Sequence, residues 1–273
     1  MTGNVILITG ASSGIGYDTA LKLAGQGHKV YGAARRVERL EPLREMGVVP
    51  LRMDVTDEES MASGVKSIID AEGRIDVLVN NAGFGYLGAI ENVPIEEAHR
   101  QLEVNLFGLA RLTQMVLPYM REQHSGRIIN TSSVAGKAVI LFGGWYNVSK
   151  FALEAFSDAL RMETKPFGIK VSIIEPSGIK TDWGLIAADN LENSSRGTAY
   201  EAPGLKMARL FRLGYTSNML SKPPCVTRAI VRAVNARNPH VRYRAGMGAR
   251  TMIGLHAILP ARWWDAIVRK MGY

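Results

Sequence analysis

The segment Thr9–Gly16, with the sequence TGASSGIG, carries three glycines between a short apolar run and an amphipathic stretch. Glycines let a backbone turn sharply and approach a ligand closely. The N-terminus of the following helix then offers unpaired N–H groups and a positive dipole end to a pyrophosphate. The turn is therefore predicted to bind a nucleotide. The residues predicted to do so are Gly10, Ser12, Ser13, Gly14, Ile15 and Gly16.

The same turn allows a second interpretation. Gly10–Gly14 also matches G-x-S-x-G, the turn that presents a nucleophilic serine in α/β-hydrolases, with Ser12 as the nucleophile. Asp182 and either His240 or His256 follow in the order of a catalytic triad. The turn would lie on the first strand, however, and the sequence has no HGGG-like oxyanion loop, which favours nucleotide binding.

Two arginines, Arg35 and Arg36, end the next predicted strand. They lie about 20 residues after the glycines, where a dinucleotide-binding domain usually carries an acid for the ribose 2′-hydroxyl. Guanidinium groups instead match a doubly charged 2′-phosphate. The cofactor is therefore predicted to be NADP(H).

Tyr146 and Lys150 stand four residues apart at the start of a predicted helix, so both side chains lie on one face. Such a pair arises readily by chance and has little value alone. Ser133 ends a predicted strand 13 residues before Tyr146, and Asn105 precedes that strand. The order and spacing of all four residues together indicate that the pair is part of a catalytic site.

Together with the glycine turn and Asn80–Gly83, this set resembles the single-domain branch of the short-chain dehydrogenase/reductases over residues 5–181. The resemblance implies that Tyr146 exchanges a proton with a substrate carbonyl or alcohol while hydride passes to or from the nicotinamide. It implies that Lys150 lowers the pKa of Tyr146, ordinarily near 10, and holds the nicotinamide ribose. Ser133 would bind the substrate oxygen. Asn105 would keep a water beside the lysine.

The resemblance also implies further cofactor contacts. Asp54 and Val55 would contact the adenine, and Asn81, Ala82 and Gly83 the adenosine side. Pro176, Ile179 and Thr181 would contact the nicotinamide end. Tyr146 and Lys150 would also contact the cofactor. Ser177 stands where the family usually has glycine, which would narrow the nicotinamide pocket. Substrate contacts are predicted from Ser133, Tyr146 and Trp183. The five histidines have no metal-ligand spacing, and no metal is predicted.

The elements that must position these residues alternate along the chain. Apolar runs predict strands at Val5–Ile8, Lys29–Ala34, Val49–Met53, Ile75–Val79, Arg127–Asn130 and Lys170–Ile174, and an edge strand at His240–Arg244. Helical patterns separate them, one opened by the capping-box spacing of Thr56 and Glu59. The pattern predicts an α/β fold, a doubly wound parallel (Rossmann-type) sheet with helices on both faces, as one domain over residues 1–273.

Composition excludes several classes of protein. The chain has 273 residues, of which 47% are hydrophobic, and a single cysteine, Cys225, which rules out a disulfide framework and fits a reducing compartment. No apolar run reaches the roughly 18 residues of a membrane span. The net charge of +8 is concentrated in residues 206–273, which hold 13 basic residues and one acid. No nucleic-acid-binding module accompanies this charge, so none is predicted.

Two segments lie outside the family's general motifs. Residues 179–222 show no clear strand and supply many apolar side chains, which predicts a lid over a bulky hydrophobic substrate. Residues 247–273 form a basic, apolar tail containing Trp263 and Trp264. This pattern is typical of a helix at a membrane surface, but also of one that packs on its own domain or on a neighbouring subunit.

The sequence therefore predicts a soluble, cytoplasmic NADP(H)-dependent carbonyl reductase or alcohol dehydrogenase, forming a homodimer or homotetramer. The substrate is predicted to be a lipophilic, steroid- or retinoid-like ketone or alcohol, with peripheral membrane contact through the tail. An alternative is a non-catalytic NADP(H)-sensing or scaffold protein. Ser133, Tyr146 and Lys150 argue against it, because a sensor needs no proton donor.

Overall fold

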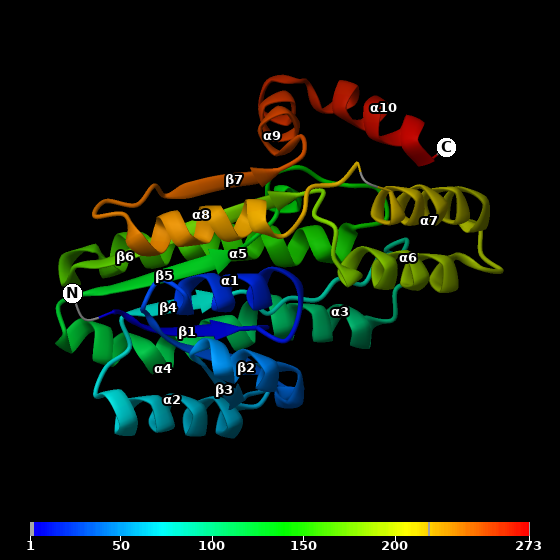
Figure 1. Ribbon diagram of the computed structural model, residues 1–273. Helices are drawn as coiled ribbons and strands as arrows, with labels where there is room; N and C mark the ends of the chain where they lie inside the picture. The colour runs from blue at the N-terminus through cyan, green and yellow to red at the C-terminus, as the bar shows by residue number, and fades with distance from the viewer. Residues whose placement is uncertain (1–2, 218, 273) are drawn as a thin grey trace.

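A computed structural model describes residues 3–217 and 219–272 and contains one seven-stranded sheet (Figure 1). The strands are β1 Val5–Thr9, β2 Lys29–Ala34, β3 Val48–Arg52, β4 Val77–Asn80, β5 Gly126–Thr131, β6 Ile169–Ser177 and β7 Arg242–Gly246. Their order in the sheet is β3-β2-β1-β4-β5-β6-β7, and every neighbouring pair is parallel. The order reverses between β1 and β4, which places a crevice at the carboxyl ends of these strands.

Helices cover both faces of the sheet. Those between β1 and β5 are α1 Gly14–Ala24, the 3₁₀-helix η1 Val37–Met46, α2 Glu58–Glu72, α3 Ile95–Leu102, the π-helix η2 Glu103–Phe107 and α4 Gly108–Glu122. Those that follow β5 are the short 3₁₀-helices η3 Val134–Gly136 and η4 Lys165–Phe167, and the helices α5 Gly144–Thr164, α6 Asp182–Ser195, α7 Glu201–Thr216, α8 Pro224–Asn235, α9 Ala249–Ile258 and α10 Ala261–Gly272.

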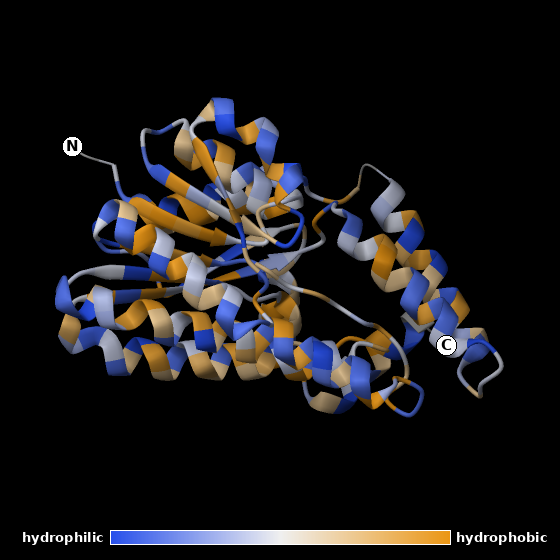
Figure 2. Ribbon diagram, turned by 90° about the horizontal axis from the view of Figure 1, so that it is seen from below, coloured by the Kyte–Doolittle hydropathy of each residue, from blue (hydrophilic) through white to orange (hydrophobic). Residues whose placement is uncertain are grey.

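The two faces of β1 show how the core forms. Ile6 and Ile8 pack with α1 and α8 on one face, whereas Val5 and Leu7 pack with α2, α4 and α5 on the other. Successive side chains of a strand point to opposite faces, so a strand covered on both sides must be apolar throughout. Figure 2 shows this apolar sheet between helices of mixed hydropathy. The predicted doubly wound fold and its predicted strands are confirmed.

One local prediction is wrong. Thr56 was expected to cap the helix that runs toward Ala71, but the N-cap of α2 is Asp57, whose carboxylate accepts hydrogen bonds from the N–H groups of Glu59 and Ser60. The Thr56 hydroxyl instead donates to Asp54, at 2.8 Å. A carboxylate accepts two N–H bonds at a helix start more readily than a hydroxyl does, so Asp57 displaces its neighbour.

The segment 179–222 forms two helices, α6 and α7, that lie side by side at one end of the sheet (Figure 1). Their inner sides pack Ala187, Leu191 and Met207 against Leu87 and Phe142, which form a small core of their own. Ile179 forms a single bridge to Ser221 at the base of the segment. The pair is therefore a packed subassembly next to the sheet.

The tail forms α9 and α10. Trp264 is buried, and its indole N–H donates to the Val139 carbonyl oxygen at 3.2 Å, while Ile253 packs with Val134. One side of the tail thus rests on its own chain, while Trp263 is exposed. Within residues 3–217 and 219–272, every helix is too short or too polar to cross a bilayer. The predicted domain, lid and tail also include residues 1, 2, 218 and 273, which lie outside the described residues.

Candidate active site

A cavity of about 1360 Å³ opens at the carboxyl ends of the central strands, between the sheet and the α6–α7 pair. It brings together residues far apart in the chain. Of the predicted site residues, those that line it are Gly10, Ser12, Ser13, Gly14, Ile15, Arg35, Arg36, Asp54, Val55, Asn81, Ala82, Gly83, Ser133, Tyr146, Lys150, Pro176, Ile179, Thr181 and Trp183. Gly16 and Asn105 lie behind this lining.

The glycine turn is built by backbone geometry that only glycine adopts easily. Gly10 and Gly14 have φ values of +65° and +57°. α1 begins at Gly14; its N-cap, Ser13, makes no side-chain capping bond, and the first turn holds no acid. The N–H groups at this helix end therefore face the cavity with a positive dipole, as a phosphate group requires.

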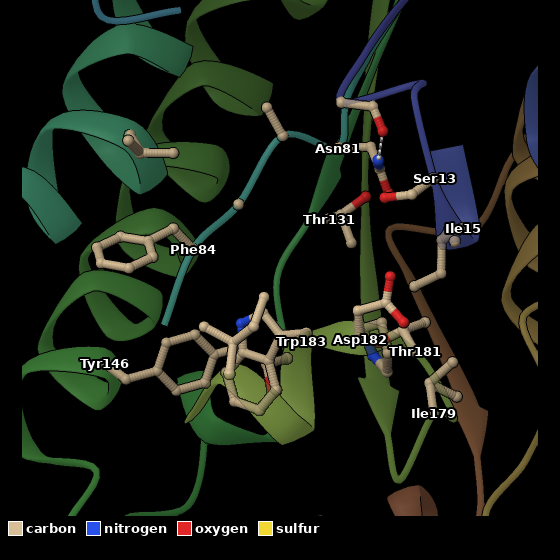
Figure 3. Close-up of a pocket in the computed structure, with 18 of the residues that line it drawn as sticks. Ser13, Ile15, Asn81, Phe84, Thr131, Tyr146, Ile179, Thr181, Asp182 and Trp183 are labelled. Carbon is tan, nitrogen blue, oxygen red and sulfur yellow. Dashed lines mark hydrogen bonds between the residues drawn. The ribbon is translucent and has the colours of Figure 1, made fainter. Parts of the chain in front are cut away.

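Gly16 holds the turn closed from behind. A Cβ at this position would lie 2.3 Å from the Gly10 carbonyl oxygen and 2.6 Å from the side-chain nitrogen of Asn81. That nitrogen donates to the carbonyl oxygens of Thr9 and Gly10, at 3.2 and 3.3 Å. Figure 3 shows Asn81 beside the turn. Gly16 and Asn81 thus fix the turn's shape.

The arginines at the end of β2 stand on the rim of the cavity. Within the part of the chain that the structure describes, neither Arg35 nor Arg36 has an ion-pair partner. Arg39, which sequence reasoning missed, lines the same rim from η1. Its spacing of four from Arg35 could have signalled it. Three guanidinium groups without carboxylate partners make this rim a site for an anion.

The adenine end of the predicted site follows β3. Both Asp54 and Val55 line the cavity. One oxygen of Asp54 already accepts from the backbone N–H and the hydroxyl of Thr56, at 3.0 and 2.8 Å. The local turn therefore fixes the orientation of this carboxylate before any ligand arrives.

Tyr146 lies at the inner end of the cavity, buried, with its ring centroid 5.1 Å from that of Trp183 (Figure 3). Burial raises the pKa of Tyr146 to about 12, against a smaller opposing effect of a hydrogen bond with Ser133. The lowering implied by the family resemblance depends on Lys150 together with the positive nicotinamide ring of a bound cofactor, and it stays a prediction. Removal from water disfavours the charged phenolate, so burial keeps the phenol neutral.

Lys150 reaches into the same region from one turn further along α5. Its ammonium donates to the Thr131 carbonyl oxygen at 3.0 Å and lies 5.9 Å from the centre of the Tyr146 ring. Burial lowers the pKa of Lys150 to about 8, and the charge of Glu154 opposes this shift. Glu154 is itself buried and ion-paired with Arg242. Lys150 is thus charged but only weakly solvated at neutral pH.

Asn105 sits in the π-helix η2, an irregularity that is frequent at functional sites. Its amide donates to the Phe84 carbonyl oxygen at 2.8 Å and to the Ser149 hydroxyl at 3.0 Å, and accepts from the Phe84 N–H at 2.9 Å. A Cβ on Gly83 would lie 3.6 Å from the amide oxygen and 3.8 Å from the Lys150 ammonium. The Asn105 side chain therefore fixes the loop at Gly83 and Phe84, after β4, that passes beside Lys150.

The outer wall of the cavity is mostly apolar. Its large side chains come from α6, α7 and α9, namely Trp183, Ile186, Phe211, Tyr215 and Met252, and α6 adds the polar Asp182 and Asn190. The indole of Trp183 lies against the backbone of Gly85, where a Cβ would approach it to 2.3 Å. Tyr215 and Met252 were not predicted as site residues, because nothing local in the sequence brings α7 or the tail to the cavity.

The arrangement does not form a hydrolase triad. Ser12 and Asp182 line the cavity, but His240 lies in a separate groove beside β7, and the ring of His256 packs edge-on against Trp264. Without a histidine near Ser12, nothing positions a base for that serine. The hydrolase interpretation is wrong.

Comparison with known proteins gives a consistent result. The family model described as short chain dehydrogenase matches residues 4–189. The probable short-chain type dehydrogenase/reductase VdlC of Helicobacter pylori is 37% identical over 263 residues, 96% of each chain. The 3-ketodihydrosphingosine reductase of Bacteroides thetaiotaomicron is 46% identical over 182 residues, 66% of each chain. The rat estradiol 17-beta-dehydrogenase 1 is 36% identical over 89% of this chain and 74% of its own.

Solved structures agree. A short-chain dehydrogenase from Streptomyces avermitilis superposes with a TM-score of 0.80 at 32% identity, covering 99% of this chain and 95% of its own. An alcohol dehydrogenase from Thermococcus sibiricus, solved with 5-hydroxy-NADP, has a TM-score of 0.72 at 26% identity, covering 89% and 96%. A metagenomic short-chain oxidoreductase in complex with NADP has a TM-score of 0.70 at 26% identity, covering 89% and 98%.

Proposed function

Because this chain belongs to the short-chain dehydrogenase family of oxidoreductases, we propose that it transfers hydride between NADP(H) and a lipophilic ketone or secondary alcohol. The observation that carries the choice of NADP(H) is the rim of Arg35, Arg36 and Arg39. A 2′-phosphate would neutralise this cluster, whereas a 2′-hydroxyl would leave it unpaired. Two solved relatives of similar fold also hold NADP-type ligands.

The cavity has the features that a nicotinamide dinucleotide needs. The turn at Gly10 and Gly14 and the start of α1 would hold the pyrophosphate. Further in, the Thr131 hydroxyl is buried without a hydrogen-bond partner and lines the cavity, which suits a polar ligand group there. The bound cofactor supplies or accepts the hydride. The adenosine end would run past Asp54, Val55 and Ala82.

The side chains at the inner end of the cavity would transfer the proton to or from the substrate oxygen. With its pKa raised to about 12, Tyr146 carries its proton at neutral pH, the form that donates to a carbonyl oxygen. Ser133, hydrogen-bonded to Tyr146, would hold the same oxygen. Lys150 would bind the nicotinamide ribose and supply positive charge when the tyrosine gives up its proton. Asn105 would support a water beside the lysine through the backbone that it fixes.

A bulky hydrophobic substrate is supported by the outer wall. Trp183, Ile186 and Phe211 present apolar surface to the cavity that Tyr146 lines, and Ser177, which lines it too, would narrow the nicotinamide pocket. The two relatives named for a sphingoid ketone and a steroid act on lipophilic molecules, judged by those names. We assign residues 179–222 as the substrate lid of one domain, over a steroid- or retinoid-like ketone or alcohol.

The assembly and place of the protein are also proposed. Phe107, Val148 and Phe151 are exposed apolar side chains on the adjoining elements η2 and α5, which suits a homodimer or homotetramer. The unpaired Cys225 is consistent with a cytoplasmic location. A basic tail with exposed apolar residues supports peripheral membrane contact.

A fluorescence titration with NADPH and NADH tests the cofactor assignment. A charge-assisted contact contributes about 1.5–3 kcal/mol, so NADPH should bind roughly tenfold or more tightly than NADH. Arg35→Ala should remove most of that difference. Lys66→Ala, an exposed cation on α2, is the control and should keep it. Equal affinity for both nucleotides in the native chain would contradict the assignment.

The alternative, a non-catalytic sensor or scaffold, makes a different prediction. It would bind NADPH yet reduce no member of a panel of steroid, retinoid and short-chain ketones. If the protein reduces any of these ketones and Tyr146→Phe abolishes that turnover, the sensor or scaffold function is excluded.

A further inference from the structure

The tail helices α9 and α10 pack against the rest of the chain on one side and are exposed on the other. Trp264 and Ile253 anchor it to the loop at Val139 and to Val134. The ring of Trp264 also meets that of His256 at 4.9 Å between centroids, which joins α10 to α9. The two helices therefore keep a defined position on the sheet edge beyond β7 (Figure 1).

The bare side combines large apolar side chains with cations. Leu255 and Ile258 stand three residues apart on α9, and Trp263 and Ile267 four apart on α10; Ile258 and Trp263 are 77% and 66% exposed. Exposed cations interleave with them at Arg250, Arg262, Arg269 and Lys270, against the single acid Asp265. We call these eight apolar and basic side chains the tail face.

The helix pair that carries the tail face borders the cavity. Met252, on α9 between the anchoring and bare residues, lines the cavity itself. Ile140, one residue after the carbonyl that Trp264 binds, lines it as well. α10 contacts α7, whose Phe211 forms the outer wall (Figure 1). The bare surface and the apolar wall are thus parts of one end of the molecule.

We propose that the tail face docks on the surface of an acidic lipid bilayer and so presents the cavity entrance to lipophilic substrate dissolved in that bilayer. The second half of this proposal rests on the proposed function; the docking itself does not. An indole suits the headgroup region, and each cation near an acidic surface strengthens binding. A helix pair lying in the interface buries apolar side chains without crossing the membrane.

Charge decides between a bilayer and a second copy of this chain. A two-fold interface brings the same patch of each copy together. Here it would bring two copies of the cluster Arg262, Arg269 and Lys270 together, and each copy adds only Asp265 as an acid from this stretch. Like charges so placed repel, whereas acidic headgroups neutralise them.

Vesicle flotation tests the docking. The full chain is mixed at low salt with phosphatidylcholine vesicles that either contain or lack phosphatidylglycerol. We expect binding only to the acidic vesicles, weakened by added salt. In Ile258→Ser/Trp263→Ser, lost apolar burial should weaken binding at least roughly tenfold. In Arg262→Ser/Arg269→Ser, the loss of two cations should weaken it roughly thirtyfold.

The matched control is Met46→Ser/Lys66→Ser, which removes an exposed apolar residue and a cation from η1 and α2, on the opposite side of the molecule in Figure 1. It should bind vesicles like the native chain. All variants should bind NADPH with native affinity, which shows that they are folded. Native binding by both tail variants, or no binding of the native chain to acidic vesicles, overturns the proposal.

Two further readings separate the hypotheses. Sedimentation of the Ile258→Ser/Trp263→Ser variant identifies a protein interface: dissociation of a native oligomer with unchanged vesicle binding overturns membrane docking in favour of a second copy. Turnover is then measured with a lipophilic ketone held in vesicles and with a water-soluble short-chain ketone. Docking without turnover of either ketone defeats the proposed function alone, and turnover without docking defeats this inference alone.

Discussion

The two walls of the cavity are lined by different kinds of chemical group. The inner wall, at the ends of β1, β2 and β4, is made of backbone groups and glycines, with arginines on its rim. The outer wall, on α6, α7 and α9, is made mostly of apolar side chains. Backbone geometry leaves little freedom of sequence, because a Cβ at Gly16 would meet a carbonyl oxygen. Side chains on a helix can change while the helix remains. One wall therefore suits a constant ligand and the other a variable one.

The largest expected effect arises where the walls meet, at Tyr146, against which Trp183 packs. Tyr146→Phe removes the proton donor but keeps the ring. Turnover should fall by about 10²–10⁴-fold, since this is the usual contribution of a general acid. NADPH affinity should stay within about threefold of the native value. Steady-state kinetics and nucleotide titration check both; native turnover in this variant would remove Tyr146 from the chemistry.

A methyl group behind the inner wall should damage that wall alone. In Gly16→Ala the new Cβ meets the Gly10 carbonyl oxygen and the Asn81 amide. We expect a loss of about 1–3 kcal/mol in the free energy of unfolding and weaker binding of NADPH. Urea denaturation and fluorescence titration measure the two effects.

The matched control lies on the same helix. Gly25→Ala adds a methyl group at the end of α1, where φ is −65° and the nearest atom is 3.5 Å from the new Cβ. It should leave both stability and nucleotide affinity nearly unchanged. If the two variants behave alike, the turn does not depend on close packing at Gly16.

A change in the outer wall should leave the inner one intact. Trp183→Ala removes the indole that packs on Tyr146 and Gly85. The KM for a bulky apolar ketone should rise roughly tenfold, because burial of such a ring contributes a few kcal/mol, shared with other contacts. The affinity for NADPH should not change. Leu185→Ala, on the same helix but outside the cavity lining, is the control. Equal losses of ketone and cofactor affinity would show that the walls are not independent.

The last effect concerns stability rather than activity, at the lysine between the walls. Burial lowers the pKa of Lys150 from 10.5 to about 8, so between these values the unfolded chain binds more protons than the folded one. Stability must then rise with pH across this window, by at most about 1.4 kcal/mol per pH unit from this group. Native protein should gain stability relative to Lys150→Met from pH 8 to pH 10 in urea denaturation.

The upper limit of that window matters for the test. The pKa of Tyr146 is raised to about 12, so above pH 10 the unfolded chain loses this proton first and stability falls again. Measurements therefore stop at pH 10. If the free energies of unfolding of the native protein and of Lys150→Met differ by the same amount at every pH from 8 to 10, the lysine is not desolvated.

Much of the inner wall could be predicted because its signals are local. A turn such as Thr9–Gly16 must follow a strand and precede a helix, and the parallel sheet then brings β1, β2 and β4 to one edge. Arg35 was predictable for the same reason, since it ends the neighbouring strand. For the outer wall, the sequence predicted only that its side chains would be mostly apolar. Tyr215 and Met252 reach the cavity through packing between distant helices, which no short pattern encodes.

The amino-acid sequence by itself determined the order of strands and helices, the glycine turn and the spacing that puts Tyr146 and Lys150 on one helix face. These depend on backbone sterics and on periodicity over a few residues. Only the tertiary structure decided the effect of burial on the Tyr146 pKa, the hydrogen bonds of Asn105 with Phe84, and the packing of His256 against Trp264. Burial and contact between distant segments set these properties, because desolvation depends on everything that surrounds a group.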